Sequence, residues 1–221
     1  MYSHTITVKG VGKVSARPDY VVISMNLEAL DKKYDKAMEL AARNIDSVTG
    51  VLVAAGFAKD DIKTTNYNVN TRYDNQRDKD GNWHNIFKGY AVSHSLKLEF
   101  DFDSKRLGEA LNAIASCEAK PQFSIAFTVK DPTAISEEML RSAAENARRK
   151  AEVLCSASGT KLGDLLQISY NWGELNVFSE TRYEMEDDCM PMMKCMGAAA
   201  VDFEPDDIDL SDTATFVWEM K

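Results

Sequence analysis

Long apolar runs are missing from this sequence of 221 residues. A membrane-spanning helix requires about 18 or more consecutive apolar residues, and no stretch comes near that length. The chain begins MYSHTITVKG, without the basic region and following apolar core of a signal peptide. We therefore predict a protein that has no membrane span and resides in the cytoplasm.

Histidine and cysteine are scarce, with three and four residues respectively, and neither is spaced as in a zinc site. The cysteines show no disulfide framework, so we predict reduced thiols. Cys117 and Cys155 fall in helical patterns and are expected to be buried. His94 shares an apolar strand face, which is typical of a core or interface histidine. His4 lies at the chain start and His84 in a charged loop.

Motifs that carry catalysis are also missing. The sequence has no G-x-S-x-G elbow, no P-loop and no complete dinucleotide fingerprint, because Gly10-Val11-Gly12 lacks a third glycine and a following helix. Asp61 and Asp164 each follow a helix-ending glycine, where aspartate usually orders a turn. We predict that the protein is not an enzyme, with no catalytic, cofactor-binding or metal-binding residues and no cofactor.

Acidic residues are concentrated in one segment of the chain, and basic residues are scarce there. The net charge is −9, and residues 180–212 hold eleven acidic residues but only Arg182 and Lys194 as basic ones. The rest of the chain is therefore close to neutral. Nucleic-acid binding requires a basic surface, so we exclude it as a function.

The clearest feature that is present is a helical pattern over residues 131–159. Asp131 is a suitable N-cap, proline follows at the first helical position, and Gly159 is a natural stop. Small or apolar residues recur at helical spacing. They are Ile135, Met139, Ala143, Ala147, Ala151 and Leu154. Because this stripe is mostly alanine, we expect its packing partner to come close, and a sheet built from the flanking segments suits that role.

Alternating apolar and polar residues predict strands in the remaining chain. The expected strands span 5–15, 20–29, 62–73, 86–102, 121–129, 165–172 and 208–220. Two further helices are expected at 31–55 and 103–116, and a charged loop at 74–85. Glycines 10 and 12 in the first strand indicate a bulge or a close approach. Each sheet should have one covered face.

The order of these elements repeats. Both long helices are preceded by a strand and followed by a strand, a long loop and another strand. We predict an α+β fold in a single domain, 1–221, of two βαββ-type halves at about 1–102 and 121–221. Mainly antiparallel sheets, each backed by a long helix, form the halves. The short helix 103–116 joins them, and 173–205 is expected to be an irregular loop.

One segment has unusual chemistry. Residues 185–196, MEDDCMPMMKCM, hold five methionines together with Cys189 and Cys195. Soft sulfur ligands suit Cu(I), so a copper or redox-binding site is one hypothesis. The alternative is a loop whose methionines contact a partner surface. Copper uptake that is lost when both cysteines are changed to serine would support the first.

The chain resembles the SIMPL domain family, which includes the bacterial YggE-like proteins. The resemblance is carried by ITVKGVGKVSARPDYVVISMNLEA at 6–29, GFAKDDIKTTNYNV at 56–69, KGYAVSHSLKLEF at 88–100, ARRKAEVLCSASGTKLGDLLQIS at 147–169 and EPDDIDLSDTATFVWEM at 204–220. The last piece departs from the family, which usually has Pro-Gly-Glu where this chain has Pro205-Asp206-Asp207.

The resemblance implies the same α+β fold and assembly into symmetric homo-oligomers. Bacterial relatives are mostly exported and linked to oxidative-stress tolerance, and a mammalian relative binds a signalling kinase. No family catalytic residues exist to transfer. Our leading hypothesis is therefore a non-catalytic, oligomer-forming protein that acts as a stress-associated scaffold or interaction module. The rivals are the soft-metal or redox protein and an unrecognised enzyme with its site between the halves.

Overall fold

The computed structural model describes residues 4–79, 82–170, 177–185 and 203–221. These residues form an α+β fold, as the sequence predicts. Its elements are β1 (Thr5–Ala16), β2 (Tyr20–Asp31), α1 (Tyr34–Ala54), η1 (Lys59–Asp61), β3 (Ile62–Arg77), β4 (Trp83–Asp101), α2 (Ser104–Ser116), β5 (Gln122–Thr128), α3 (Pro132–Ala157), β6 (Leu162–Tyr170), β7 (Phe178–Met185) and β8 (Ile208–Met220).

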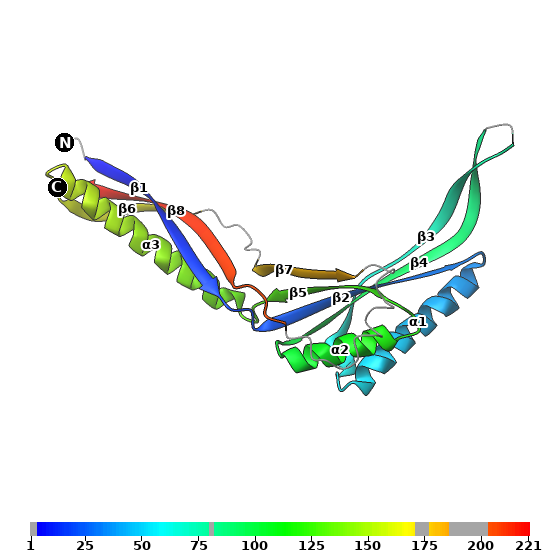
Figure 1. Cartoon of the computed structure of the whole chain (residues 1–221). Helices are drawn as coiled ribbons and strands as arrows, with labels where there is room; N and C mark the ends of the chain where they lie inside the picture. The colour runs from blue at the N-terminus through cyan, green and yellow to red at the C-terminus, as the bar shows by residue number, and fades with distance from the viewer. Residues whose placement is uncertain (1–3, 80–81, 171–176, 186–202) are drawn as a thin grey trace. The chain divides into compact units, whose positions relative to one another are not determined.

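The strands form two sheets. One has the order β1-β8-β6 and the other the order β3-β4-β2-β5-β7 (Figure 1). The pairs β1–β8, β6–β8, β2–β4 and β3–β4 are antiparallel. The β1–β8 register runs from Thr5↔Glu219 to Ala16↔Ile208 without a shift. The first strand of the chain therefore pairs with the last.

The chain divides into two compact units, each with its own helix and sheet. Unit 1 comprises residues 1–19, 128–180 and 205–221, and unit 2 comprises 20–127 and 181–204. This division differs from the sequence halves 1–102 and 121–221, because β1 belongs with α3 and β8 in unit 1. The expectation of a helix-backed antiparallel sheet in each part is confirmed.

In unit 1, α3 packs closely on β1 and β8. A Cβ atom at Gly10 would lie 2.1 Å from the carbonyl oxygen of Ala143, and one at Gly12 would lie 2.1 Å from that of Met139. Glycine is therefore required at both positions, because any side chain would push the helix off the strand. Since β1 has no bulge against β8, the two glycines serve the close approach.

The buried stripe of α3 follows an i, i+4 row. It consists of Met139, Ala143, Ala147, Ala151 and Cys155. The sequence prediction placed Leu154 at the end of this stripe, but Leu154 is exposed and Cys155 is buried in its place. The prediction was wrong at this residue because such a row is inclined to the helix axis, so it moves gradually around the helix.

Unit 2 buries large side chains instead. Its core draws on β2, β4, β5, α1 and α2. The buried members include Ile23, Met25, Leu52, Leu98, Leu107, Ile114 and Phe127. The predicted inward face of β4 is confirmed, since its alternate residues from Val92 to Phe100 are buried.

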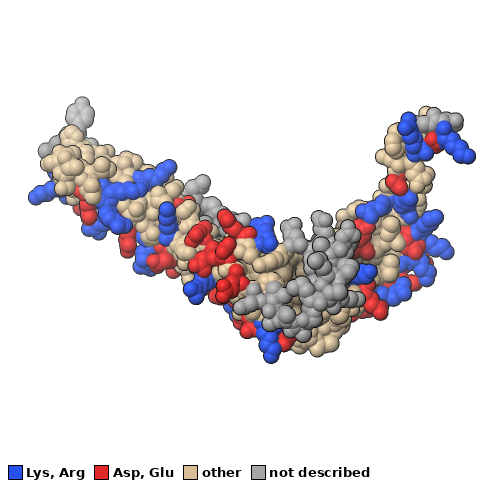
Figure 2. All heavy atoms as spheres, in the orientation of Figure 1, with Lys and Arg blue, Asp and Glu red and all other residues tan. Residues whose placement is uncertain are grey.

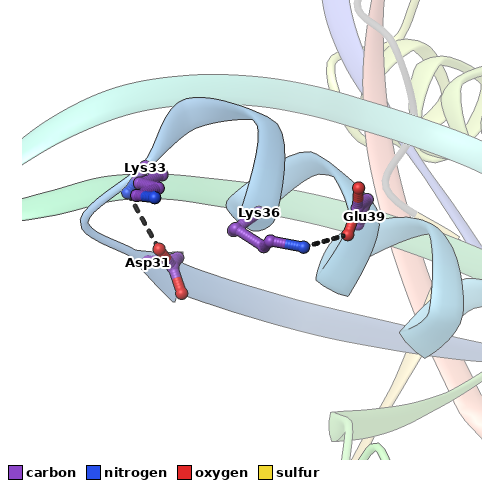
Figure 3. Close-up of polar contacts among 4 residues, drawn as sticks. All are labelled: Asp31, Lys33, Lys36 and Glu39. Atoms are coloured by element: carbon purple, nitrogen blue, oxygen red, sulfur yellow. Dashed lines mark hydrogen bonds and ion pairs between the residues drawn. The ribbon is translucent and has the colours of Figure 1, made fainter.

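Aspartates precede all three α-helices in the described chain. The Asp31 carboxylate accepts from the Lys33 amide at 2.8 Å, directly before α1, and Lys36 pairs with Glu39 at 3.0 Å in its first turns (Figure 3). Asp103 accepts from the Arg106 amide at 2.7 Å, and Asp131 caps α3. Asp103 and Asp131 thereby satisfy first-turn amides that have no partner within the helix, whereas Asp31 binds the amide of the residue before α1.

Two segments are more regular than the sequence suggested. The ladder between β3 and β4 continues to Arg77↔Trp83, so most of the charged loop predicted at 74–85 is paired strand. Residues 178–185 form β7, within the range 173–205 for which irregular structure was expected. Polar side chains hide the strand pattern in the first case, because a ladder held by backbone bonds does not need apolar residues on either face.

Candidate functional site

His94 lies on the helix-facing side of β4 and is 9% exposed. Its Nε2 lies 2.8 Å from the hydroxyl of Thr64, and its ring meets the edge of Tyr67 at 5.1 Å between centroids. Nδ1 is buried and makes no hydrogen bond with the described residues. A buried lone pair is better tolerated than a buried N–H, so we assign the proton to Nε2, which donates to Thr64.

Burial lowers the pKa of His94 below its ordinary value of 6.5. The imidazole is therefore neutral at pH 7 and forms part of the packing between β3, β4 and α1. Tyr67 extends this contact, since its hydroxyl lies 3.2 Å from the sulfur of Met38 on α1. His94 thus contributes to the packing of unit 2 through its contacts with Thr64 and Tyr67.

The other sequence candidates are not brought together. His84 Nε2 lies 2.7 Å from Asp78 within the β3–β4 hairpin, and it is exposed. Cys117 and Cys155 are buried free thiols in different units, which confirms the prediction that both are buried. Cys189 and Cys195, and residues 186–196 of the predicted copper site, lie outside the described residues.

Asp61 and Asp164 occupy structural positions in the chain. Asp61 ends the short helix η1 between α1 and β3, and its amide bonds to the Ala58 carbonyl at 3.0 Å. Asp164 on β6 lies 3.4 Å from the ammonium group of Lys221. Asp61 thus lies in the connection between α1 and β3, and Asp164 makes an exposed ion pair. Within the described ranges, no group of three or more His, Cys, Asp and Glu residues is placed to hold a metal ion.

Exposed aromatic residues gather on the β3–β4 hairpin. The exposed Tyr73 and Phe87 and the half-buried Tyr90 form a chain of edge-to-face contacts, with centroids 5.6 and 5.4 Å apart. Trp83 is 68% exposed nearby in sequence. Basic and acidic side chains lie together along this hairpin (Figure 2), and Lys88 pairs with Asp74 at 3.1 Å. The hairpin therefore combines apolar rings with charges of both signs.

A second apolar surface lies on β6 of unit 1. Leu165 is exposed, as are Leu166 and Ile168, which are each 54% exposed. Leu165 lies opposite Trp218 and Ile168 opposite Phe216 on β8, so both continue the face that α3 covers over β8. α3 has few contacts with β6, and this part of the sheet face is therefore open.

The opposite edge of the same sheet is closed by α3. The Val11 amide donates to Asn146 Oδ1 at 3.1 Å, and the Lys13 amide to Ser142 Oγ at 3.3 Å. Lys150 Nζ donates to the Lys9 carbonyl at 3.1 Å. This row of polar side chains was not predicted, although its i, i+4, i+8 spacing is present in the sequence. It places all three on one helix face, beside the alanine stripe.

Comparison with known proteins identifies the family. The model of the SIMPL family, described as "Protein of unknown function (DUF541)", matches residues 6–218. The chain belongs to the SIMPL family. The resemblance given by the five sequence pieces is thereby confirmed, as is the family's α+β fold.

Similar SIMPL proteins include a 26 kDa periplasmic immunogenic protein of Brucella melitensis, which is 26% identical over 164 residues. The uncharacterized protein YggE of Escherichia coli K12 is 23% identical over 166 residues. These matches cover 74% and 75% of this chain and 65% of each relative. The chain thus matches slightly less than two thirds of each relative's length. No helix in the described ranges is long and apolar enough to cross a membrane.

Proposed function

We propose that this SIMPL protein is a non-catalytic, oligomer-forming protein that acts as a scaffold or interaction module. The observation that carries the proposal is the exposure of apolar side chains on β6, at Leu165, Leu166 and Ile168. Sheet edges with exposed apolar residues are sites of protein association. The exposed rings of the β3–β4 hairpin add a second surface of the same kind.

The contacts of the candidate residues support the non-catalytic part. His94 packs between strands and helix, Asp61 ends η1, and Asp164 pairs with Lys221. His94 is thus held in packing contacts, and Asp164 pairs with a lysine at the surface. An enzyme with its site between the halves stays a prediction, and so does the soft-metal site at 185–196.

Light scattering on the purified chain tests self-association. We expect a molar mass that is a multiple of 24.7 kDa at micromolar concentration. A monomer across that range would contradict the proposal.

Titration with Cu(I) tests the rival, with the Cys189→Ser/Cys195→Ser double variant as control. Binding by the parent alone would favour the soft-metal protein, and equal uptake by both would end that hypothesis.

The compartment and the process belong to the same proposal. Free thiols at Cys117 and Cys155 support the cytoplasm, where cysteines stay reduced. The Brucella relative is named periplasmic, so cell fractionation of the native protein is the deciding measurement. The stress-associated role is supported by the family resemblance. Survival of a deletion strain under peroxide tests it.

A further inference from the structure

Four strands lie at the sheet edges, and they differ in how they are protected. β1 is sealed by Ser142, Asn146 and Lys150 of α3. β3 and β7 carry charged residues along their length, and β3 has two register irregularities against β4. Charges and irregular pairing are the usual means by which an edge avoids pairing with another chain. Three of the four edge strands are therefore protected against pairing with another chain.

The fourth edge, β6, has two register shifts against β8 between Leu162 and Gln167, but it is the least charged of the four edge strands. It carries one charged residue in nine, Asp164, which is paired with Lys221. Its register with β8 runs without a shift from Gln167↔Val217 to Tyr170↔Ala214. Within the described part of the chain, β6 pairs with β8 alone. β6 is therefore the edge of this sheet that can accept a further strand.

The direction of the backbone groups follows from the bonds on both sides of β8. Residues 9, 11 and 13 of β1 bond to α3, so the even-numbered residues of β1 face β8. In an antiparallel ladder, successive residues bond to opposite sides. Val217 therefore faces Gln167 on β6, in agreement with the reciprocal bonds of Lys161 and Lys221 at 2.7 and 2.8 Å. It follows that Ile168 directs its N–H and C=O away from β8.

We propose that β6 pairs antiparallel with β6 of a second copy of this chain, close to Ile168. This inference rests on the proposed oligomer and identifies its contact. Outward backbone groups of the two strands bond to each other, and Ile168 of each copy contacts apolar residues of the other. The two three-stranded sheets thereby become one sheet of six strands, with β6 and its copy at the centre.

Two properties of the strand favour a second copy as the partner. First, β6 is compatible with itself, because its nine residues contain a single charge and antiparallel pairing therefore sets apolar or neutral residues opposite each other. Second, the far edge of each sheet is sealed by α3. Addition therefore stops after one pairing and gives a closed twofold dimer, where an open edge on both sides would give a fibre.

The first test is light scattering of the full-length Leu165→Lys/Ile168→Lys variant. Lysines on both strands place like charges at the contact, so we expect the molar mass to fall to about half that of the unmodified chain or less. The matched control is Val153→Lys/Leu154→Lys on α3, which adds the same charge at residues 62% and 53% exposed. We expect this control to keep the parental mass.

The outcomes separate this inference from the proposed function. A monomeric parent contradicts both. An oligomeric parent with an equally large Leu165→Lys/Ile168→Lys variant overturns the β6 contact and leaves the oligomer in place. A loss of mass in the α3 control alone would move the interface to the helix and also overturn the inference.

Amide exchange on the unmodified chain covers the case in which the lysine variant does not fold. At high concentration, the amides of Ile168 and Gln167 should both be protected. On dilution to the dissociated state, the Ile168 amide should exchange faster, while that of Gln167 stays bonded to β8. Exchange at Ile168 that does not depend on concentration, in a chain whose mass does, would refute β6 pairing.

Discussion

The two compact units differ in the size of the side chains through which their helices pack on an antiparallel sheet. In unit 1, the alanines of α3 lie against Gly10 and Gly12 of β1. In unit 2, α1 and α2 bring leucine and isoleucine side chains such as Leu52 and Ile114 against a sheet that contributes large residues such as Phe127. Because the first interface is already at its closest approach, it should be sensitive to added atoms. The second should be sensitive to their removal.

The largest effect is expected from truncation in unit 2. Phe127 is fully buried and meets the rings of Phe102 and Tyr183, with centroids 5.4 and 6.2 Å away. Phe127→Ala should lower the free energy of unfolding by about 3–5 kcal/mol. The control is Trp83→Ala, at a residue 68% exposed, for which we expect a change below about 0.5 kcal/mol. Urea denaturation measures both, and equal losses would contradict the contrast.

The reciprocal change in unit 1 adds a single carbon. Gly10→Ala places a methyl group 2.1 Å from the Ala143 carbonyl oxygen, so the helix must shift. We expect a loss of about 2–3 kcal/mol. Gly50→Ala in α1 is the matched control, because no atom lies within 4 Å of its new methyl group. That variant should gain about 0.5–1 kcal/mol in unfolding experiments. If both substitutions had the same sign, the proposed close approach would not limit stability.

A moderate effect is expected from pH in unit 2. Burial lowers the pKa of His94, so the unfolded chain takes up this proton at a higher pH than the folded chain does. The contribution of His94 to stability is therefore complete above about pH 6.5 and falls as the pH drops below that value. Between pH 7 and pH 5, the thermal unfolding midpoint of the parent should fall more steeply with decreasing pH than that of His94→Leu. The parent should lose more stability, and parallel curves would contradict the assignment.

The smallest effect concerns the sealed edge of unit 1. Asn146→Ala removes the acceptor of the Val11 amide, at a cost of about 1 kcal/mol. Asn146→Asp keeps an acceptor at the same place and should retain most of the stability. Glu145→Ala, one residue away and exposed, should change little. Thermal unfolding measures the series. A loss in Asn146→Asp as large as in Asn146→Ala would show that the hydrogen bond does not stabilise this edge.

Much of the fold could be predicted from local pattern. The residues of α2 and β8, and the burial of Cys117, follow from periodicity and capping, which depend on neighbours in sequence. The end of the α3 stripe and the length of β3 were not predicted correctly. Both depend on partners distant in sequence, since the inclined row follows the sheet beneath α3 and the polar ladder of β3 is held by β4.

The candidate surface was less accessible to sequence reasoning than the core was. A strand such as β6, LGDLLQISY, reads as partly apolar whether it is central or at an edge. Its place beside β8, outside the cover of α3, is set by the sheet order β1-β8-β6. Ser142, Asn146 and Lys150 are likewise regularly spaced in the sequence. Their hydrogen bonds to β1 could not be predicted, because they depend on the position of β1 beside α3.

By itself, the sequence determined most of the helices and strands and the apolar side of most of them, because these depend on spacings of two to four residues along the chain. It also determined the close contact of α3, since alanine and glycine side chains are so small that the helix and the strand must lie close together to pack. Tertiary structure decided which strands meet. Pairing of β1 with β8 joins residues about 200 positions apart, and such contacts are selected by the packing of the whole unit. The sealed and open edges of the sheet follow from that choice.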